Sequence, residues 1–283
     1  MTGTCASEVT VVLVAYNSAA VLDDAIASVP DGARVIVVDN ASTDASVQVA
    51  RDRGAQVIEA GDNLGFGTAC NLGAKKATTS FVLFLNPDAR LLADTLTVLL
   101  TEADQHPGAV AFGPAILNET GRPELPRAAT LLEDAPAMME SSPSVSCEVG
   151  FLSGACLLVR RDAFDAVGGF DEAIFLYLED DDLCVRLREV GGTLRLTPSA
   201  RVRHHQGTSS PPSLTSLKLR NHHTMASHVY LARKHGLAVD FDGMRRKAQR
   251  RLLKARLTFD RQRVAINLGR LSGLAAKGPG RQL

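Results

Sequence analysis

Apolar residues along the first 115 positions occur in short runs separated by stretches with helical spacing. The first run, at 9–16, is continuous and β-branched, as in a strand that is buried on both faces of a parallel sheet. The runs lie at 9–16, 34–40, 55–61 and 80–89. Helical spacing between them predicts helices over 18–29, 41–54 and 67–78. This alternation predicts an α/β fold with a doubly wound, Rossmann-like sheet that is mostly parallel and flanked by helices.

Start and stop signals refine these elements and extend them along the chain. The helix over 41–54 should begin at Ser42 or Thr43 and end at Gly54. Residues 118–148 show no clear period and are interpreted as an irregular acceptor-side loop that orders on binding. The segment 150–172 predicts a strand followed by a short helix.

Four consecutive acids, Glu179 to Asp182, precede a further helical pattern. Leu183, Leu187 and Val190 recur at i, i+4 and i+7, and Gly191-Gly192 provides a stop. Acids are favoured in the first turn of a helix, where they meet the positive end of the macrodipole. The same carboxylates are also suited to moving a proton or binding a metal. The run by itself leaves both interpretations open.

Composition is that of an ordinary soluble globular protein of 283 residues, with 45% hydrophobic and 22% charged residues. The five cysteines are odd in number and form no CxxC pair, which argues against a disulfide framework or a zinc knuckle and for a reducing compartment. No signal peptide and no apolar stretch of membrane-spanning length is apparent. We therefore expect a cytoplasmic protein, with a peripheral position at the inner face of the membrane left open.

The formal net charge of zero conceals a strong asymmetry. From Ser216 to Leu283 there are 16 Lys and Arg residues against three acids, a balance of +13, whereas the first 215 residues carry −13. The segment 243–271 is rich in helix formers and predicts a basic helical extension. Such a helix can pack on the acidic first domain, lie on anionic lipid or bind nucleic acid. No nucleic-acid-binding motif is present, and no nucleic-acid partner is expected.

Polar clusters follow three of the predicted strands, where parallel sheets bind their ligands. They are Tyr16-Asn17, Asp39-Asn40 and Asn86-Pro87-Asp88. The turn after the first strand, AYNSAA, lacks the glycines of a dinucleotide-binding loop, so the sequence argues against an NAD enzyme. Asp39 is suited to a ribose hydroxyl or a base N–H. These features favour a nucleotide that is held by side chains and a metal.

Asp88 is the candidate metal ligand. It comes just after the buried run FVLFL, and a hard divalent cation bridging two phosphates needs carboxylate oxygens from the protein. The alternative is that Asn-Pro-Asp simply forms a turn that closes the strand.

Seven segments, in this order, resemble glycosyltransferase family 2, and most closely its bacterial rhamnosyltransferase-like branch. They are VVLVAYNSAAVL, VIVVDNASTDAS, NLGFGTACNLG, FLNPDA, SGACLLVRRDAF, GGFDEAIFLYLEDDDLCVRLREVGG and VRHHQGTSS. The resemblance spans about residues 9–235. It implies a GT-A fold, an inverting mechanism, a nucleotide-sugar donor and Mg or Mn. It divides the chain into a glycosyltransferase domain at 1–215, with a nucleotide-sugar half (about 1–115) and an acceptor half (about 116–215), and a basic helical region at 216–283.

Carried over residue by residue, the resemblance makes Asp180 the catalytic base and Glu179 its acidic neighbour. Asp182 is then the acid at the helix start, and Asp181 occupies a slot that is usually apolar. The metal ligands are Asp88 and His204, with His204 preferred to His205. The implied nucleotide-sugar contacts are Tyr16, Asn17, Asp39, Asn63, Gly65, Asn71, Asn86, Asp88 and Gly154.

Two positions depart from the family pattern. Asn86 stands where the DxD motif often has Asp, which leaves Asp88 as the principal metal ligand. Cys70 stands where many members have Arg, which puts a base or phosphate contact there in doubt.

The resulting prediction is an inverting, metal-dependent glycosyltransferase of polysaccharide, cell-wall or related biosynthesis. It would move a sugar, with L-rhamnose as first choice, from a dTDP- or UDP-sugar to a hydroxyl of a glycan, a lipid-linked glycan or a natural product. The alternatives are a nucleotidyltransferase, which would usually have a glycine-rich and basic phosphate loop after the first strand, and a non-catalytic sugar-nucleotide sensor. No oligomeric state is predicted.

Overall fold

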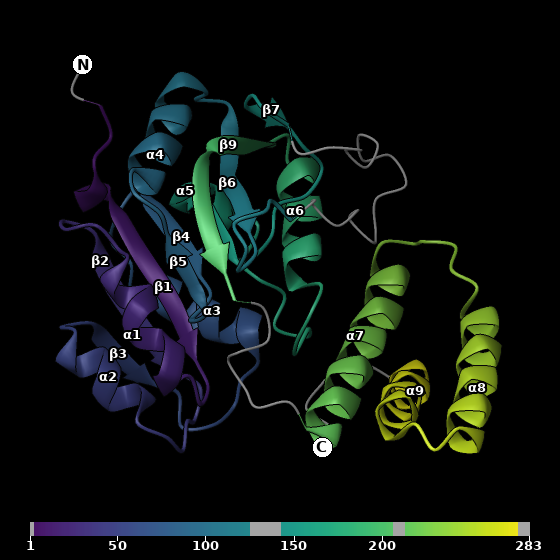
Figure 1. Ribbon diagram of the computed structural model, residues 1–283. Coiled ribbons are helices and arrows are strands. Elements are labelled where there is room, and N and C mark those ends of the chain that lie inside the picture. Colours follow the sequence, from purple (N-terminus) through teal and green to yellow (C-terminus); the bar gives the residue numbers. More distant parts are fainter. Residues whose placement is uncertain (1–2, 125–142, 206–212, 277–283) are drawn as a thin grey trace. The chain divides into compact units, whose positions relative to one another are not determined.

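The computed structural model describes residues 3–124, 143–205 and 213–276 (Figure 1). The chain forms two compact units. Unit 1 comprises Met1–Leu64, Thr68–Phe170 and Asp180–Ser210, and unit 2 comprises Gly65–Gly67, Asp171–Glu179 and Pro211–Leu283. The central part of the expected irregular loop, 125–142, lies outside the described residues, as does the end of the VRHHQGTSS segment, 206–210.

Unit 1 is built on a sheet of nine strands within the described residues (Figure 1). These strands are β1 (Val9–Ala15), β2 (Arg34–Asp39), β3 (Gln56–Glu59), β4 (Phe81–Leu85), β5 (Ala89–Leu91), β6 (Ala109–Leu117), β7 (Cys147–Glu148), β8 (Cys156–Arg160) and β9 (Thr193–His204). The order is β3-β2-β1-β4-β8-β6-β9-β5, and β7 pairs with β9. Strands β3, β2, β1 and β4 are parallel, whereas β8 is antiparallel to both of its neighbours. The α/β class predicted from the sequence is confirmed. The antiparallel pairs of the sheet all involve β8 or β9.

Short helices connect these strands. They are the 3-10 turn η1 (Ala6–Glu8) and the helices α1 (Ala19–Ala27), α2 (Ser46–Asp52), α3 (Phe66–Ala74), α4 (Thr95–Gln105), α5 (Arg161–Ala166) and α6 (Glu179–Glu189). The start expected for α2 at Ser42 or Thr43 is wrong. The backbone N–H and hydroxyl of Ser46 both donate to Asp44, and this local hydrogen bonding delays the helix until Ser46.

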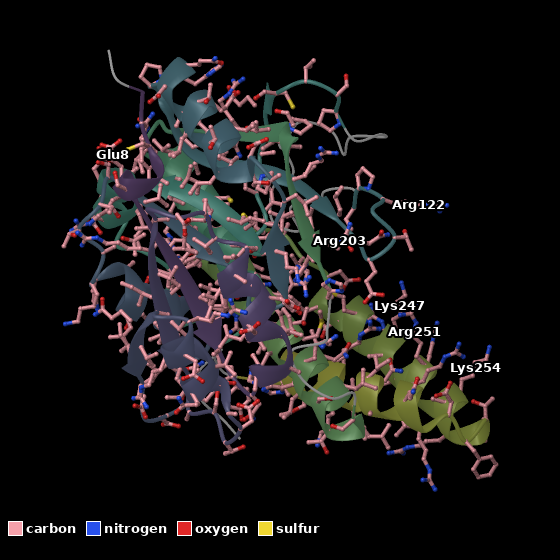
Figure 2. The ribbon with its side chains drawn as sticks, turned by 60° about the vertical axis from the view of Figure 1, so that its left-hand side comes forward. Glu8, Arg122, Arg203, Lys247, Arg251 and Lys254 are labelled. Carbon is pink, nitrogen blue, oxygen red and sulfur yellow. The ribbon has the colours of Figure 1, made fainter. Side chains whose placement is uncertain are left out.

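Unit 2 contains three helices in its described part: α7 (Leu214–Lys234), α8 (Phe241–Leu257) and α9 (Arg261–Leu274). Helix α9 packs closely on α7 at Gly269 and Gly273, which have no Cβ. A Cβ at these positions would lie 2.2 and 2.3 Å from carbonyl oxygens of α7. The basic segment expected as helix is broken at 258–260, and Lys247, Arg251 and Lys254 lie along α8 (Figure 2). No helix in the described residues is long and apolar enough to cross a bilayer.

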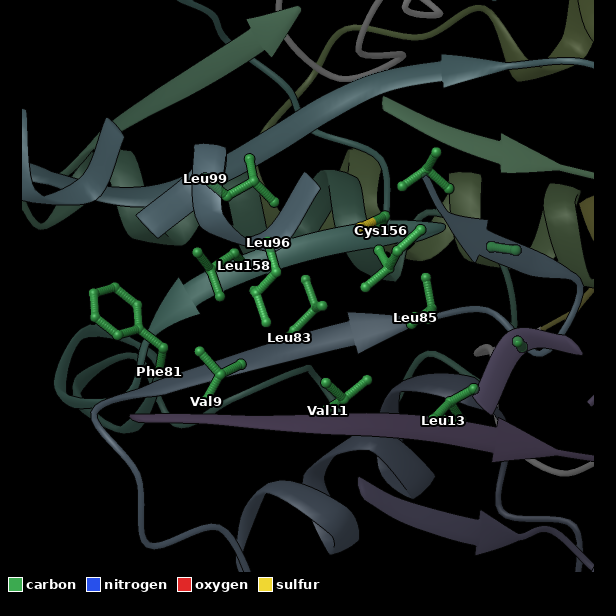
Figure 3. Close-up of a cluster of buried hydrophobic side chains, with 14 of the residues drawn as sticks. Val9, Val11, Leu13, Phe81, Leu83, Leu85, Leu96, Leu99, Cys156 and Leu158 are labelled. Carbon is green, nitrogen blue, oxygen red and sulfur yellow. The ribbon is translucent and has the colours of Figure 1, made fainter. Parts of the chain in front are cut away.

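The core of unit 1 lies between the sheet and its helices. Alternate residues of β1, Val9, Val11 and Leu13, pack with Leu83 and with the α4 residues Leu96 and Leu99 in one cluster (Figure 3). On the other face, a Cβ at Gly73 of α3 would lie 2.5 Å from Val12. Helices cover both faces of β1, which explains why its run is continuously apolar. This core fixes the carboxyl edge of the sheet, where the polar clusters lie.

Candidate active site

The loops after β1 and β2 are joined by Asn17. In the parallel pair of β1 and β2, Ala15 lies opposite Asp39, so both strands end at the same edge of the sheet. The side-chain oxygen of Asn17 accepts hydrogen bonds from the backbone N–H of Thr43, at 2.7 Å, and from its hydroxyl. The Asn17 N–H donates in turn to Ser42. Asn17 therefore holds the two loops together, and its φ of +53° is one that asparagine tolerates.

Asp39 presents an acceptor atom at this edge. The side chain is 4% exposed, and its Oδ2 accepts a hydrogen bond from the Ser42 N–H at 3.1 Å. The buried Oδ1 has no hydrogen-bond partner among the described residues. A buried carboxylate oxygen without a donor is unfavourable, so this atom suits an N–H or O–H of a ligand. Tyr16, one residue past β1, is 42% exposed and available to a ligand ring.

Asn63 braces the end of β2. Its side-chain oxygen accepts from the Asn40 amide at 2.9 Å, while the Asn40 oxygen accepts from the Leu64 N–H at 2.8 Å. In this structure Asn63 therefore holds the loop that follows β2 in place.

The Asn86-Pro87-Asp88 segment forms a turn and also presents ligand atoms. The Ala89 N–H donates to the Asn86 carbonyl, which closes the turn before β5 pairs with β9. Asp88 is buried, and its Oδ1 lies 3.2 Å from His204 Nε2. The Asn86 amide lies 3.3 Å from the same nitrogen. The turn and the ligand interpretation of this motif are thus compatible.

Of the two neighbouring histidines, His204 is the one that faces Asp88. His205 donates its backbone N–H to the Asp88 carbonyl, and its ring approaches Glu119 at 3.5 Å. The geometry of Asp88 and His204 fits a shared divalent cation, because a carboxylate oxygen and an imidazole nitrogen converge there. No group of three or more metal-ligating side chains occurs in the described ranges. A set of two fits a cation whose other ligands are phosphate oxygens and water.

Asp180 is oriented by two backbone donors. The Gly154 N–H donates to its Oδ2 at 2.8 Å, and the Asp181 N–H donates to its Oδ1 at 3.1 Å. Ala155, which follows Gly154 in the chain, accepts a hydrogen bond from the Asn86 N–H at its carbonyl oxygen, at 3.0 Å. The Gly154-Ala155 dipeptide therefore joins the Asp180 carboxylate to the turn that holds Asp88. A Cβ at Gly154 would lie 3.3 Å from that of Asp180, which is a tight contact, so glycine favours this approach.

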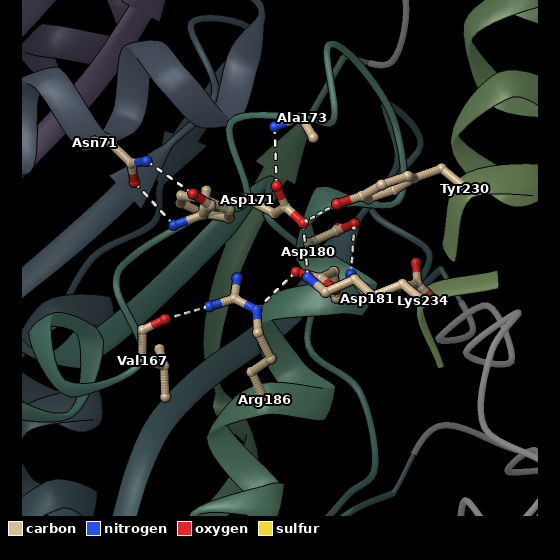
Figure 4. A network of polar contacts seen from close by, with 11 residues as sticks. Asn71, Val167, Asp171, Ala173, Asp180, Asp181, Arg186, Tyr230 and Lys234 are labelled. Carbon is tan, nitrogen blue, oxygen red and sulfur yellow. Dashed lines mark hydrogen bonds and ion pairs between the residues drawn. The ribbon is translucent and has the colours of Figure 1, made fainter. Parts of the chain in front are cut away.

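The four acids have different surroundings. Helix α6 begins at Glu179, so the expectation that Glu179 and Asp180 precede the helix is wrong, and all four acids lie in its first turn. Asp182 is fully buried and accepts from Arg186 Nε at 2.7 Å. Arg186 also donates to the Val167 carbonyl (Figure 4). Asp182 is thus engaged in a structural pair, which the i, i+4 spacing of Asp182 and Arg186 could have indicated.

Asn71 anchors the end of the segment that precedes α6. Its amide donates to the Phe170 carbonyl and its oxygen accepts from the Phe170 N–H, both at 2.8 Å (Figure 4). A Cβ at Gly169, whose φ is +74°, would lie 2.5 Å from the Asn71 oxygen. Both groups of the Asn71 amide thus have backbone partners.

Within unit 2, the segment 171–179 is held by α7. Tyr230 and Lys234 donate to Asp171 at 2.8 and 2.7 Å, and the Ala173 N–H donates to the same carboxylate (Figure 4). Burial disfavours the ionised form of Asp171, but these hydrogen bonds outweigh it and lower its pKa. This anchor was not predicted from the sequence, although Tyr230 and Lys234 are spaced i, i+4 on α7.

Gly65 also lies in unit 2. Its φ is +84°, and a Cβ there would lie 2.2 Å from the Phe175 carbonyl oxygen, which accepts from the Phe66 N–H. Gly65 is therefore required for the close approach of these two segments.

Comparisons with known proteins identify the family and the fold of this chain. Residues 10–168 match the family model described as glycosyl transferase family 2. N-acetylglucosaminyl-diphospho-decaprenol L-rhamnosyltransferase from Mycobacterium tuberculosis is 34% identical over 232 residues, which cover 71% of this chain and 75% of the relative. A mannosyltransferase from Pyrobaculum calidifontis, solved with GDP-Man and Mn2+, has a TM-score of 0.60 at 16% identity and covers 95% of this chain and 88% of its own.

Residues 1–349 of Staphylococcus aureus TarS, solved with UDP, have a TM-score of 0.56 at 17% identity and cover 93% of this chain and 90% of that one. These two structures share the GT-A fold with the present chain. Because the family model covers more than half of its length, this chain belongs to glycosyltransferase family 2 and is a glycosyltransferase.

Proposed function

We propose that this glycosyltransferase moves a sugar, with inversion, from a nucleoside diphosphate to an acceptor hydroxyl that Asp180 deprotonates. The observation that carries the proposal is the Gly154-Ala155 dipeptide. One hydrogen bond joins it to Asp180 and the next joins it to Asn86, which supports a proposed base beside a proposed metal-ligand pair. An inverting transfer needs this pairing of a base with a charge-neutralising group on the leaving side.

The nucleotide would be held by the carboxyl ends of β1 and β2. Asp39 Oδ1 would accept the N–H of a pyrimidine base or a ribose hydroxyl, and Tyr16 would lie against the base. A pyrimidine donor, dTDP- or UDP-linked, is compatible with this acceptor atom, because thymine and uracil each carry one ring N–H that could donate to it. The relative from M. tuberculosis is named for L-rhamnose transfer, which supports L-rhamnose as the sugar.

Asp88 and His204 would hold Mg2+ or Mn2+ together with the diphosphate. The bound cation would supply Lewis-acid neutralisation of the charge that develops on the leaving diphosphate. The Asn86 amide lies 3.3 Å from His204 Nε2, so it would lie beside the bound cation and the nucleotide. The presence of Mn2+ in the P. calidifontis mannosyltransferase structure supports a divalent cation in this fold.

Asp180 would receive the acceptor proton on a carboxylate fixed by the Gly154 and Asp181 N–H groups. The acceptor oxygen would form its bond to the anomeric carbon as the bond to the diphosphate oxygen breaks on the opposite side. A positioned general base typically contributes about 10²–10⁴-fold in rate. Glu179 would assist as the acidic neighbour in the first turn of α6.

The acceptor is proposed to be a hydroxyl of a lipid-linked glycan. The name of the M. tuberculosis relative describes a sugar linked through diphosphate to decaprenol, which supports this class. Such an acceptor would require the enzyme to act at a membrane surface as a peripheral protein.

A thermal-shift panel tests the donor and the metal together. We expect dTDP- or UDP-sugars to stabilise the full chain in the presence of Mn2+ or Mg2+, and dTDP-rhamnose to give the largest shift. Asp88→Ala and His204→Ala should remove the part of the shift that depends on the cation, whereas His205→Ala serves as the matched control and should retain it. Stabilisation of Asp88→Ala equal to that of the unaltered chain would refute the metal assignment.

A further inference from the structure

Helix α8 in unit 2 has two faces of different character. Ala248, Leu252 and Ala255 are buried. At 100° per residue, the opposite side of the helix carries Arg246, Arg250, Leu253 and Leu257, spaced i, i+4, i+7 and i+11. Leu253 and Leu257 are 61% and 73% exposed, so two leucines lie on the outer side of a helix that already has a buried side.

Phe259 extends this apolar surface just past the end of α8. It is 90% exposed, the highest value among the large apolar side chains of the described residues. Its φ is +53°, and the Phe259 and Asp260 N–H groups bond back to the carbonyls of Arg256 and Ala255. This is the Schellman arrangement, in which the left-handed position is usually glycine. A phenylalanine there is strained and gains no burial within the chain.

Cations surround these apolar side chains. The sequence of α8 contains seven Lys and Arg residues and one acid, Asp242. Arg246 approaches Asp240 only at 3.9 Å, on the surface. A second copy of the same surface would be repelled by this charge. Exposed Leu and Phe among Lys and Arg are instead typical of helices that lie in the interface of an anionic bilayer.

We propose that the α8 outer face, formed by Arg246, Arg250, Leu253, Lys254, Leu257 and Phe259, binds the surface of a bilayer that contains anionic lipids. The apolar side chains enter the boundary between headgroups and acyl chains, and the cations bind lipid phosphates. This surface is separate from the transfer chemistry: binding to vesicles requires neither donor nor acceptor. Its failure is therefore distinguishable from a failure of the proposed reaction.

Co-sedimentation of the full chain with vesicles tests the proposal. We expect binding to vesicles of phosphatidylcholine with phosphatidylglycerol and little binding to phosphatidylcholine alone, with a decrease at high salt. Equal binding to both vesicles, or binding to neither, would overturn the proposal. So would binding of duplex DNA or RNA by this face without any binding of anionic vesicles.

Paired variants assign the binding to this face. Arg250→Glu with Lys254→Glu should lower the partition coefficient roughly 25-fold or more, because each cation near an anionic surface contributes a factor of about five. Lys75→Glu with Lys76→Glu makes the same charge change at exposed positions of unit 1 and should have a much smaller effect. Equal losses in the two pairs would indicate a non-specific effect of net charge and contradict the assignment.

The apolar part is tested in the same way. Leu253→Gln with Leu257→Gln should weaken vesicle binding about tenfold, whereas Val145→Gln with Val190→Gln alters two exposed valines of unit 1 and should not. Phe259→Gly should weaken vesicle binding while raising the thermal midpoint. A purely structural role for Phe259 predicts the reverse, a lower midpoint with unchanged binding.

Discussion

The two oxygens of the Asp39 carboxylate have different surroundings. One accepts a hydrogen bond from Ser42, and the other is buried without a partner in the described part of the chain. Native proteins rarely leave such an atom unsatisfied, and a ligand or an ordered water can supply the donor. This asymmetry supports the proposed role of Asp39 in ligand binding more directly than its position after a strand does.

Replacement of Asp39 by Asn should separate binding from folding. The Ser42 hydrogen bond can be kept by the amide oxygen, but the NH2 group then occupies the position of the free acceptor. We expect pyrimidine nucleotide binding to weaken by about 10–150-fold, the value of a hydrogen bond to a charged acceptor. Isothermal titration with UDP and dTDP measures this, and the thermal midpoint of the ligand-free chain should not fall. Unchanged affinity for both nucleotides would exclude a base or ribose contact.

At the scale of single residues, the sequence indicates the chemical role that a side chain can play better than it indicates the hydrogen-bond partners of that side chain. Carboxylates and an imidazole, as at Asp88, His204 and Asp180, are residue types suited to metal and proton chemistry. In the structure, Asp88 lies next to His204, and the Gly154-Ala155 dipeptide links Asp180 to Asn86. Asn71 and Asn17 are different, because an amide that binds a nucleotide and an amide that binds the backbone are the same residue type. The bidentate contact of Asn71 with Phe170 joins positions 99 residues apart, which no local pattern reveals.

Elements with strong local signals were predicted well. The β-branched runs of β1 and β2 were identified within one residue at each end. Elements that depend on distant partners were not: β6 (Ala109–Leu117) was not predicted as a strand, although it is held by β8 and β9. The left-handed residues Tyr177 and Leu178, both with φ of +69°, directly precede α6 and likewise carry no sequence signal.

The break between α8 and α9 gives a prediction about stability. Phe259 occupies the left-handed position of the cap at a cost of about 1–2 kcal/mol relative to a right-handed residue. Phe259→Gly should therefore raise the free energy of unfolding by about 0.5–1 kcal/mol, after the extra freedom of glycine in the unfolded chain is subtracted. Urea unfolding followed by far-UV circular dichroism measures this. Thr258→Gly, one residue earlier at φ of −95°, is the matched control and should lower stability; a decrease in both variants would contradict the cap assignment.

At the scale of the whole molecule, unit 2 should lose stability in mild acid. His223 is buried in α7 and stacks on Phe175 with ring centroids 4.7 Å apart. Burial, together with the neighbouring His222, lowers the pKa of His223 to about 4. The unfolded chain, with an ordinary histidine pKa near 6.5, binds a proton between pH 6.5 and 4 that the folded chain does not. Stability is thus complete above pH 6.5 and falls as the pH drops towards 4.

The expected loss is about 3 kcal/mol over that window. His223→Phe keeps an aromatic ring against Phe175 and removes the proton site, so its unfolding free energy should fall less between pH 7 and pH 5. Urea titrations at the two pH values measure the difference. An identical pH dependence in both proteins would show that His223 does not titrate as described.

The division of the chain into two units explains what the sequence could and could not predict at this scale. The charge asymmetry correctly drew attention to the basic C-terminal helices, and the family motifs indicated a GT-A fold. The antiparallel insertion of β8 between β4 and β6 was not predicted, because pairing order in a sheet depends on contacts between distant segments. The contribution of Gly65–Gly67 and Asp171–Glu179 to unit 2 was missed for the same reason.

The role of Asp180 is tested by comparing sugar transfer with donor binding in Asp180→Asn. The variant keeps an oxygen for the Gly154 N–H but cannot accept a proton from the acceptor hydroxyl. With the donor found by the thermal-shift panel, turnover should fall by about 10²-fold or more while the donor Kd stays unchanged. Asp162→Asn, an exposed acid in the first turn of α5, is the control and should transfer sugar normally. Normal turnover in Asp180→Asn would contradict the assignment of Asp180 as the base.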